Sequence, residues 1–269
     1  MAIPIAVTIA GSDSGGGAGI QADLKSFSAN GVYGASVITA LTAQNTLGVS
    51  GIHAVPADFV TAQIDAVFSD LDVAAVKIGM VSQRPVIEAI AQGLARWLPP
   101  NVVLDPVMVA TSGDRLIDDD CLDALRTWLI PRSRIITPNL PEAAALLDDD
   151  VAHDPTAIER QGSELLTLGC EAVLIKGGHG EGPTSTDYLF SAAGIVALVA
   201  PRIATRNTHG TGCSLSSAIA AQLARGEELD VAVGYAKAWV SEAIAAADRL
   251  KVGKGHGPIH HFHAFESGS

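Results

Sequence analysis

Short, largely apolar runs alternate along the chain with longer segments that have helical spacing. The short runs are residues 5–10, 36–40, 73–78, 102–104, 134–136 and 172–175. Because they are continuously apolar, they predict parallel strands that are covered on both faces of a sheet. The helical segments are residues 19–29, 58–69, 84–97, 118–128, 156–168, 213–224 and 231–249. Strands that alternate with helices predict βαβ units and an α/β fold with a doubly wound, mostly parallel sheet.

Two further apolar runs, residues 188–190 and 195–198, enclose the turn-forming sequence Ser191-Ala-Ala-Gly194. This pattern predicts an antiparallel hairpin at one edge of the sheet. Since no Pro- or Ser-rich linker and no internal repeat interrupts the chain, we expect a single domain over residues 1–265. We expect residues 266–269 to be a disordered or cloning-derived tail.

Composition narrows the classes of function. The chain has 269 residues, with 17 Lys and Arg against 29 Asp and Glu, which gives a formal net charge of −12. A nucleic-acid-binding domain would normally present a basic surface, so we expect no nucleic-acid partner. A small phosphorylated ligand stays compatible with this charge because a few well-placed cations can bind it locally.

The cysteines and the hydropathy of the chain bear on its cellular location and on disulfide or zinc sites. Cys121, Cys170 and Cys213 are scattered and odd in number, which disfavours both a disulfide framework and a thiolate zinc site. The first residues lack the basic stretch of a signal peptide, and no apolar run approaches the ~18 residues of a membrane span. We therefore expect a cytoplasmic protein without a membrane partner.

Polar and glycine-rich segments follow several of the predicted strands, at the end of a parallel sheet where ligands bind. They are residues 11–19, 44–45, 79–80, 105–106, 139–142 and 176–178. The first segment matches neither the dinucleotide-binding glycine pattern nor the P-loop. It is either a tight turn or a loop whose backbone approaches a ligand, and the entropy cost of three adjacent glycines favours the ligand.

The second glycine segment, Asn207-Thr-His-Gly-Thr-Gly-Cys213, leads directly into a predicted helix. Backbone N–H groups of Gly210, Thr211 and Gly212 would form an anion hole at the positive end of that helix. Cys213 would lie in the first turn, where the helix field lowers the pKa of a thiol and favours the thiolate. The alternative is that Cys213 is a small buried hydrophobic residue.

The Gly-Thr-Gly-Cys sequence resembles the Gly-x-Gly-Asp loop of the ribokinase-like superfamily, with Cys213 in place of Asp. More narrowly, the chain resembles the bifunctional hydroxymethylpyrimidine/phosphomethylpyrimidine kinases of thiamine biosynthesis, in which Cys occupies this position. The resemblance is carried by residues 10–25, 39–45, 77–80, 105–107 and 207–213, and by the tail at 257–263. It implies a ribokinase-like three-layer fold, in which helices cover both faces of the sheet.

On the pyrimidine side, the resemblance implies that Gln44 binds the aminopyrimidine, because a carboxamide offers both a donor and an acceptor. The other residues implied in substrate binding are Asp23, Gly11, Ala18, Met80 and Val107. Alternative roles remain open for three of these residues. Gln44 could cap a turn, Asp23 could complement a helix dipole, and Val107 could belong to the core.

On the nucleotide side, the resemblance implies that Asp105 and Glu142 hold Mg²⁺, and that Lys176, Asn139 and Lys237 approach the phosphates of ATP. Hard carboxylate oxygens suit Mg²⁺, and an ammonium group can act as a point charge on a polyphosphate. Glu142 and Asn139 could equally form a helix capping box, and either lysine could be an ordinary solvated side chain.

The implied reaction is the ATP-dependent phosphorylation of 4-amino-5-hydroxymethyl-2-methylpyrimidine to its monophosphate and then to its diphosphate. The residues implied in catalysis are Cys213 as the base, Gly210, Thr211 and Gly212 as the anion hole, and Lys176. The resemblance also implies a homodimer. Three other hypotheses are a pyridoxal kinase of the same superfamily, a non-catalytic pyrimidine-binding module, and a cysteine hydrolase with Cys213 as its nucleophile.

Overall fold

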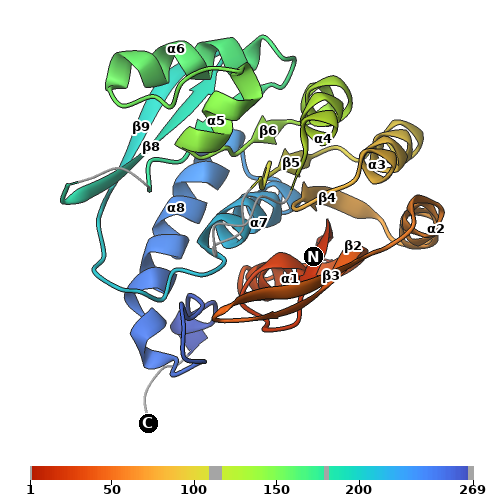
Figure 1. Ribbon diagram of the computed structural model, residues 1–269, viewed down its shortest axis with the longest axis horizontal. Coiled ribbons are helices and arrows are strands. Elements are labelled where there is room, and N and C mark those ends of the chain that lie inside the picture. Colours follow the sequence, from red (N-terminus) through yellow and green to blue (C-terminus); the bar gives the residue numbers. More distant parts are fainter. Residues whose placement is uncertain (1, 109–116, 179–181, 266–269) are drawn as a thin grey trace.

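The computed structural model describes residues 2–108, 117–178 and 182–265. Within these ranges the strands form one nine-stranded sheet in the order β3-β2-β1-β4-β5-β6-β7-β8-β9 (Figure 1). Five neighbouring pairs, from β2-β1 to β6-β7, are parallel, and the pairs that involve β3, β8 and β9 are antiparallel. The strands are β1 Ile5–Asp13, β2 Tyr33–Asn45, β3 Gly48–Ala54, β4 Val73–Ile78, β5 Val102–Leu104, β6 Ile135–Ile136, β7 Ala172–Ile175, β8 Thr184–Ser191 and β9 Gly194–Pro201.

Helices cover both faces of this sheet. On one face lie α2 Ala57–Phe68, α3 Arg84–Trp97, α4 Asp119–Ala124, α5 Leu140–Leu147 and α6 Pro155–Leu166. On the other face lie α1 Gly19–Ala29, α7 Thr211–Ala224 and α8 Leu229–Ala245. Four short helical turns complete the described part: η1 Leu125–Leu129, η2 Ile130–Arg132, η3 Ala247–Arg249 and η4 His263–Phe265. The ribokinase-like three-layer arrangement expected from the sequence is therefore confirmed (Figure 1).

The hydrophobic core consists of two layers, one on each face of the sheet. The larger layer packs strand residues such as Val7, Ile9 and Ile78 against α2 to α6. The smaller layer packs the opposite strand faces, with Ala75 and Val103, against α1, α7 and α8. Because successive residues of a strand point to opposite faces, a strand between two helical layers must be apolar at every position. This explains the continuous apolar runs in the sequence.

The antiparallel part of the sheet is larger than the sequence predicts. The hairpin β8-β9 is present, as expected, and its strands extend well beyond residues 188–190 and 195–198. A second antiparallel pair, β2-β3, was not predicted, and it carries Gln44 within a strand and not in a loop after one. The side chains of β3 are mostly exposed, so this strand has no continuous apolar run. The assignment of residues 1–265 to one domain stays a prediction, and residues 266–269 lie outside the described residues.

A segment near the C-terminus, residues 253–261, binds together two parts of the chain that are far apart in sequence. The hydroxyl of Thr46, in the β2-β3 turn, accepts hydrogen bonds from the backbone N–H groups of Lys254 and Gly255. The backbone N–H of Gly257 donates to the side chain of Asn207, and its carbonyl accepts from the N–H of His209. We call residues 253–261 the C-terminal strap.

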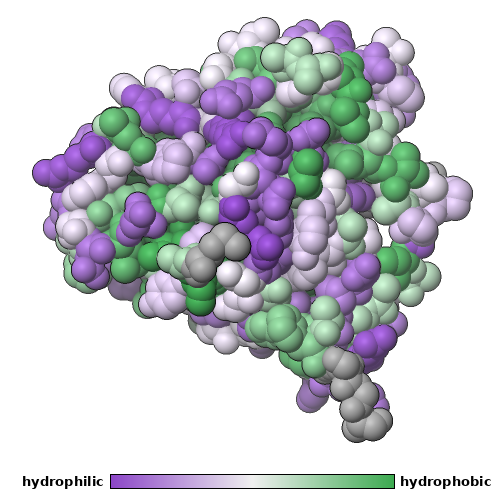
Figure 2. All heavy atoms as spheres, turned by 180° about the vertical axis from the view of Figure 1, so that it is seen from behind, coloured by the Kyte–Doolittle hydropathy of each residue, from purple (hydrophilic) through white to green (hydrophobic). Residues whose placement is uncertain are grey.

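The outer surface mixes apolar and polar residues. On the face seen in Figure 2, hydrophobic residues form separate patches between hydrophilic ones. Among the exposed apolar side chains are Ile195, Val196 and Val199 of β9, the last strand of the sheet. No helix in the described ranges is long and apolar enough to span a membrane.

Candidate active site

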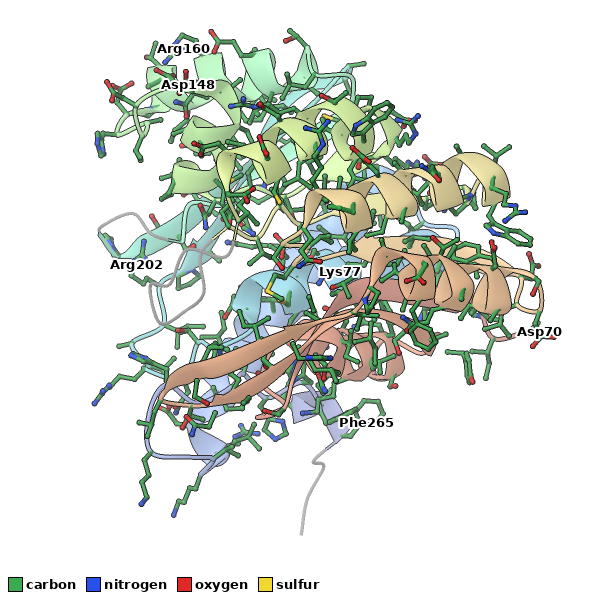
Figure 3. All side chains as sticks on the ribbon, turned by 45° about the vertical axis from the view of Figure 1, so that its right-hand side comes forward. Asp70, Lys77, Asp148, Arg160, Arg202 and Phe265 are labelled. Atoms are coloured by element: carbon green, nitrogen blue, oxygen red, sulfur yellow. The ribbon has the colours of Figure 1, made fainter. Side chains whose placement is uncertain are left out.

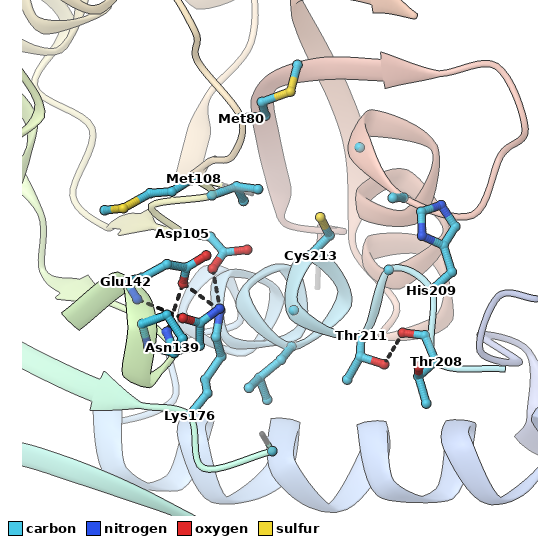
Figure 4. A pocket seen from close by; sticks show the side chains of 18 of the residues that line it. Met80, Asp105, Met108, Asn139, Glu142, Lys176, Thr208, His209, Thr211 and Cys213 are labelled. Atoms are coloured by element: carbon cyan, nitrogen blue, oxygen red, sulfur yellow. Dashed lines mark hydrogen bonds and ion pairs between the residues drawn. The ribbon is translucent and has the colours of Figure 1, made fainter. Parts of the chain in front are cut away.

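A cavity of about 1090 Å³ opens at the carboxyl ends of the parallel strands, beside the first turn of α7. It brings together the polar segments that follow β1, β4, β5, β6 and β7 (Figure 4). The predicted site residues that line it are Gly11, Ala18, Gln44, Met80, Asp105, Val107, Asn139, Glu142, Lys176, Gly210, Thr211, Gly212, Cys213 and Lys237. These side chains gather because parallel strands end at one edge of the sheet.

Asp23 is the predicted substrate-binding residue that the structure does not bring to this cavity. Its carboxylate is fully buried beneath the pocket in an ion pair with Lys77, at 2.9 Å. It also accepts hydrogen bonds from the hydroxyls of Thr8 at 2.6 Å and Ser217 at 2.7 Å. Lys77 lies in the middle of the molecule (Figure 3). The helix-dipole alternative is also not needed, because Lys77 and two hydroxyls occupy the carboxylate.

An acidic pair and a lysine form one wall of the cavity. The Lys176 ammonium is 2.7 Å from Asp105 Oδ1 and 3.8 Å from Glu142 Oε2 (Figure 4). Thr137 also donates to Asp105 Oδ1, at 3.0 Å. Lys176 directly follows β7. Its backbone N–H donates a hydrogen bond to the carbonyl of Pro138, beside the start of α5. Lys176 is thus not a solvated surface lysine, and its ammonium is fixed among the carboxylates.

The two carboxyl groups have different protonation behaviour. Burial disfavours ionisation of Asp105, but the nearby ammonium groups of Lys176 and Lys77 outweigh it and lower the pKa. Burial raises the pKa of Glu142 to about 7, while Lys176 lowers it and Asp105 raises it. Glu142 also forms the capping box of α5 with Asn139, each accepting a backbone N–H of the other at 2.8 Å. The capping role therefore holds Oε2 of Glu142 close to Lys176.

Lys237 lines the cavity from α8 and is also not a solvated surface residue. Its ammonium lies 2.8 Å from Asp187 Oδ2 on β8. The other oxygen of Asp187 accepts the backbone N–H of Gly177 at 2.9 Å. Asp187 therefore connects Lys237 to the turn that follows Lys176. Sequence analysis did not find Asp187, because it lies inside a strand and no motif marks it.

The second glycine segment forms the start of α7, as predicted. Gly210 is the N-cap, with a positive φ of 79°, and a Cβ there would collide with the carbonyl of Gly17. The first amides of a helix have no partner within the helix, which suits an anion. Thr211 is an exception here, because its backbone N–H bonds to the carbonyl of Thr208 at 3.2 Å. The predicted anion hole therefore loses the backbone N–H of Thr211 as a donor.

The predicted low pKa of Cys213 is wrong for this pocket. Burial raises the pKa of its thiol to about 11, and the carboxylates of Asp23 and Asp105 add to the rise. The ammonium of Lys77 and the backbone N–H of Gly19 lower it, but not enough to reverse the direction. Desolvation of the sulfur is therefore the dominant effect, and the thiol is protonated at neutral pH. Its side chain faces the cavity beside Asp105 (Figure 4).

The first glycine cluster, residues 11–19, is organised by Asp13, which the sequence analysis did not single out. Its buried carboxylate accepts the backbone N–H groups of Gly15 at 2.8 Å, Gly17 at 3.0 Å and Ala18 at 2.9 Å. His209, which precedes the anion loop, lies 2.9 Å from the same carboxylate. The signal was present in the sequence, since an Asp followed by glycines is typical of a turn that the side chain stabilises.

Comparisons with known proteins agree with this arrangement. Residues 13–260 match the family model described as phosphomethylpyrimidine kinase. A hydroxymethylpyrimidine/phosphomethylpyrimidine kinase of Rhizobium meliloti is 59% identical over 96% of this chain and 97% of its own. The crystal structure of a phosphomethylpyrimidine kinase from Clostridium difficile has a TM-score of 0.80 at 44% identity, covering 90% of this chain and 99% of its own. The ADP complex of a Bacillus subtilis pyridoxal kinase has a TM-score of 0.91 at 32% identity, covering 99% and 100%. The chain belongs to the phosphomethylpyrimidine kinase family.

Proposed function

We propose that this protein uses ATP to phosphorylate 4-amino-5-hydroxymethyl-2-methylpyrimidine to its monophosphate and then to its diphosphate, a step of thiamine biosynthesis. The observation that carries the proposal is the layout of the cavity. An acidic pair with Lys176 faces the amino end of α7, and Gln44 lies on the opposite wall with the first glycine cluster. Relatives that are 59% and 55% identical carry the name hydroxymethylpyrimidine/phosphomethylpyrimidine kinase.

The pyrimidine would bind at the carboxyl ends of β1 and β2. Gln44 offers a donor and an acceptor that match the ring nitrogen and the amino group of an aminopyrimidine. Met80 and Val107 provide apolar walls, and the absence of a side chain at Gly11 makes room for the end of Met80, since a Cβ there would lie 2.5 Å from it. These contacts would place the ring flat beside the glycine cluster, with its hydroxymethyl group toward α7.

The phosphates of ATP would bind between Lys176 and the first turn of α7. Asp105 and Glu142 fit Mg²⁺, because both present hard oxygen atoms at the cavity wall and leave other positions to phosphate oxygens and water. When bound, the metal would neutralise charge that develops on the transferring phosphoryl group. Lys176 and Lys237 would add point charges, and Asn139 would keep Glu142 in place. Catalysis then depends mainly on positioning and charge neutralisation.

Cys213 lies where a base for the substrate alcohol would be needed. With a pKa of about 11, the thiol is protonated before the substrates bind, so it is not a preformed thiolate. A protonated thiol cannot take up another proton, so Cys213 would accept the alcohol proton only from its thiolate form, after losing its own proton to the solvent. The second phosphorylation has an anionic phosphate oxygen as its nucleophile and needs no such base.

A pyridoxal kinase is the second candidate activity, since both substrates carry a hydroxymethyl group on an aromatic nitrogen heterocycle. Pyridoxal kinases of Bacillus subtilis and Staphylococcus aureus share the fold with TM-scores of 0.91. The cysteine hydrolase hypothesis is disfavoured by the high pKa of Cys213. A homodimer and a cytoplasmic location complete the proposal and rest on the family resemblance and the sequence.

Mass spectrometry of the reaction products tests the function directly. The purified protein is incubated with Mg²⁺, ATP and the aminopyrimidine, and pyridoxal is supplied in a parallel reaction. We expect the pyrimidine monophosphate first and then the diphosphate. Phosphorylation of pyridoxal without any pyrimidine product would establish the second candidate. Binding of the pyrimidine without transfer would support the non-catalytic module.

A further inference from the structure

The side chains of Asp13 and His209, which the mechanism above does not use, form a polar chain with Gln44. Nε2 of His209 is 2.9 Å from Oδ2 of Asp13 and 3.4 Å from Nε2 of Gln44. On its other side, Oε1 of Gln44 lies 3.1 Å from the hydroxyl of Thr42. Asp13 and His209 are buried, and all four side chains border the cavity.

The proton on His209 is fixed by Asp13. Burial disfavours the charge of Asp13, but the hydrogen bonds from His209 and from two backbone N–H groups outweigh it and lower the pKa, so the carboxylate is ionised. An ionised carboxylate only accepts hydrogen bonds, and Nε2 of His209 must therefore carry the proton. A nitrogen that donates to Asp13 has no lone pair for Gln44. An amide nitrogen of Gln44 facing it would set a donor against a donor.

The hydroxyl of Thr42, on the other side of Gln44, also indicates how the Gln44 carboxamide is oriented. It has one proton, and it lies 2.9 Å from the carbonyl oxygen of Ser12, which can only accept. Its oxygen therefore offers a lone pair to Gln44. The two ends of a carboxamide have nearly the same shape, so the turned orientation fits the same space. Both neighbours favour the amide nitrogen of Gln44 beside Thr42 and its carbonyl oxygen beside His209.

We propose that His209 is a positioning residue, which holds the Gln44 carbonyl on the side of the anion loop and thereby sets the direction in which the pyrimidine ring binds. This inference rests on the proposed function. With the carboxamide in this orientation, the 4-amino group pairs with the carbonyl near His209, and the ring nitrogen N3 pairs with the amide near Thr42. The hydroxymethyl group on C5 is adjacent to C4. It therefore points toward His209 and Gly210, where phosphoryl transfer takes place, and the methyl group on C2 points away.

The packing around His209 prevents its ring from turning away. A Cβ on Gly17 would collide with the imidazole, so the absence of a side chain there is what allows the ring to lie against the glycine cluster. The backbone N–H of His209 is held by the carbonyl of Gly257 in the C-terminal strap, at 3.0 Å. The imidazole is thus fixed from both sides, and its proton has one direction.

The test compares two substrates that differ only at the edge that Gln44 contacts. One is the aminopyrimidine, and the other is its 4-oxo analogue, in which N3 carries a proton and the donor and acceptor are exchanged. The variants are His209→Leu, which removes the donor, and His209→Gln, whose amide nitrogen can replace Nε2. His53→Leu, at an exposed position of β3, is the matched control. The kcat/KM for each substrate is measured at saturating ATP.

We expect His209→Leu to lower kcat/KM for the aminopyrimidine by about tenfold to hundredfold, because the Gln44 carboxamide can then turn to the orientation that mismatches the ring and Asp13 loses its side-chain donor. The 4-oxo analogue should lose much less, so the preference of the enzyme falls by a similar factor while the KM for ATP stays the same. His209→Gln should restore most of the preference, and His53→Leu should not change it. Thr42→Val, which removes the acceptor on the other side, should reduce the preference in the same direction.

An equal loss on both substrates in His209→Leu, or an unchanged preference in Thr42→Val, would overturn the positioning role. Thr42→Val keeps the test decisive if His209→Leu does not fold, because Val has nearly the shape of Thr. A wild-type protein that phosphorylates neither pyrimidine gives a different result, which refutes the proposed function itself.

Discussion

Cys213 carries its thiol at the first turn of α7, and burial keeps that thiol protonated at neutral pH. The base for the substrate alcohol would therefore be the thiolate, the minor form at neutral pH, because a protonated thiol cannot take up another proton. The phosphate oxygen that attacks in the second step is already ionised. The two phosphorylations thus make different demands on one side chain.

Cys213→Ala should therefore slow the first phosphorylation by about 10²- to 10⁴-fold, the usual range for a general base. The second phosphorylation should be slowed much less. Single-turnover rates for the alcohol and for the monophosphate, measured by rapid quench, check this difference. Equal losses in both steps would leave Cys213 with a packing or electrostatic role.

The residues at the pocket show where sequence information ends. Asp105, Glu142 and Lys176 could be predicted together, because each follows a strand of the parallel sheet and such strand ends meet. The position of Asp23 could not be predicted correctly. Its partner Lys77 is 54 residues away, and no local sequence pattern indicates the ion pair. The direction of the pKa shift of Cys213 could not be predicted from the sequence either, because it depends on how far the folded chain removes water from the sulfur.

At the scale of elements, the buried pair of Lys77 and Asp23 joins four of them. Lys77 comes from β4 and Asp23 from α1, and the hydroxyls that Asp23 accepts come from β1 and α7. The start of α7, with residues 210–212, is therefore anchored through a buried pair that does not line the cavity. Removal of one partner leaves an uncompensated charge in the interior, which is far more costly than removal of both.

Lys77→Met should lower the free energy of unfolding by about 3–5 kcal/mol, since it isolates the buried carboxylate of Asp23. The double variant Lys77→Met with Asp23→Leu should recover a large part of this loss. Urea denaturation followed by circular dichroism measures both. A double variant that is as unstable as the single one would show that the hydroxyls of Thr8 and Ser217, not the charge, dominate the site.

His261 connects the C-terminal strap to α7 and should give the protein a measurable acid sensitivity. Its Nε2 lies 2.8 Å from the hydroxyl of Ser214, and burial lowers its pKa from 6.5 to about 3. The unfolded chain therefore binds a proton that the folded chain excludes. The contribution of neutral His261 to the free energy of unfolding is complete above pH 6.5. It decreases as the pH falls toward 3, with a slope of about 1.4 kcal/mol per pH unit.

His261→Gln removes this titration but keeps a donor for Ser214. The free energy of unfolding of the variant should depend less steeply on pH between 4 and 6 than that of the wild type. Thermal or urea unfolding at several pH values gives both curves. Parallel curves would mean that the proton on His261 is not excluded by the fold.

At the scale of the whole molecule, the cavity has two halves with different chemistry. The glycine cluster and β2 line the half that we propose for the pyrimidine. Asp105, Glu142, Lys176 and the start of α7 line the half that we propose for metal and phosphates. Removal of Mg²⁺ with a chelator should abolish phosphoryl transfer and leave the affinity for the aminopyrimidine unchanged. Calorimetry without nucleotide and a kinase assay with added chelator measure the two effects. Loss of pyrimidine binding on chelation would contradict this division.

The layered fold could be predicted from the sequence to a large extent, because strands covered on both faces must be apolar throughout. The runs at 73–78, 102–104 and 172–175 coincide with β4, β5 and β7. The edge strand β3 was missed for the same physical reason, since its side chains are mostly exposed. The capping box that the sequence offered at Asn139 and Glu142 is present and opens the short helix α5.

The C-terminal strap has a consequence for how the protein is made. Residues 253–261 hold both the β2-β3 turn beside Gln44 and the loop that leads to Gly210. Both halves of the cavity therefore wait for a segment that the ribosome delivers after all of the strands and all of the larger helices. A nascent chain that has already folded its sheet should bind neither substrate well until residues 253–261 have been synthesised and have docked.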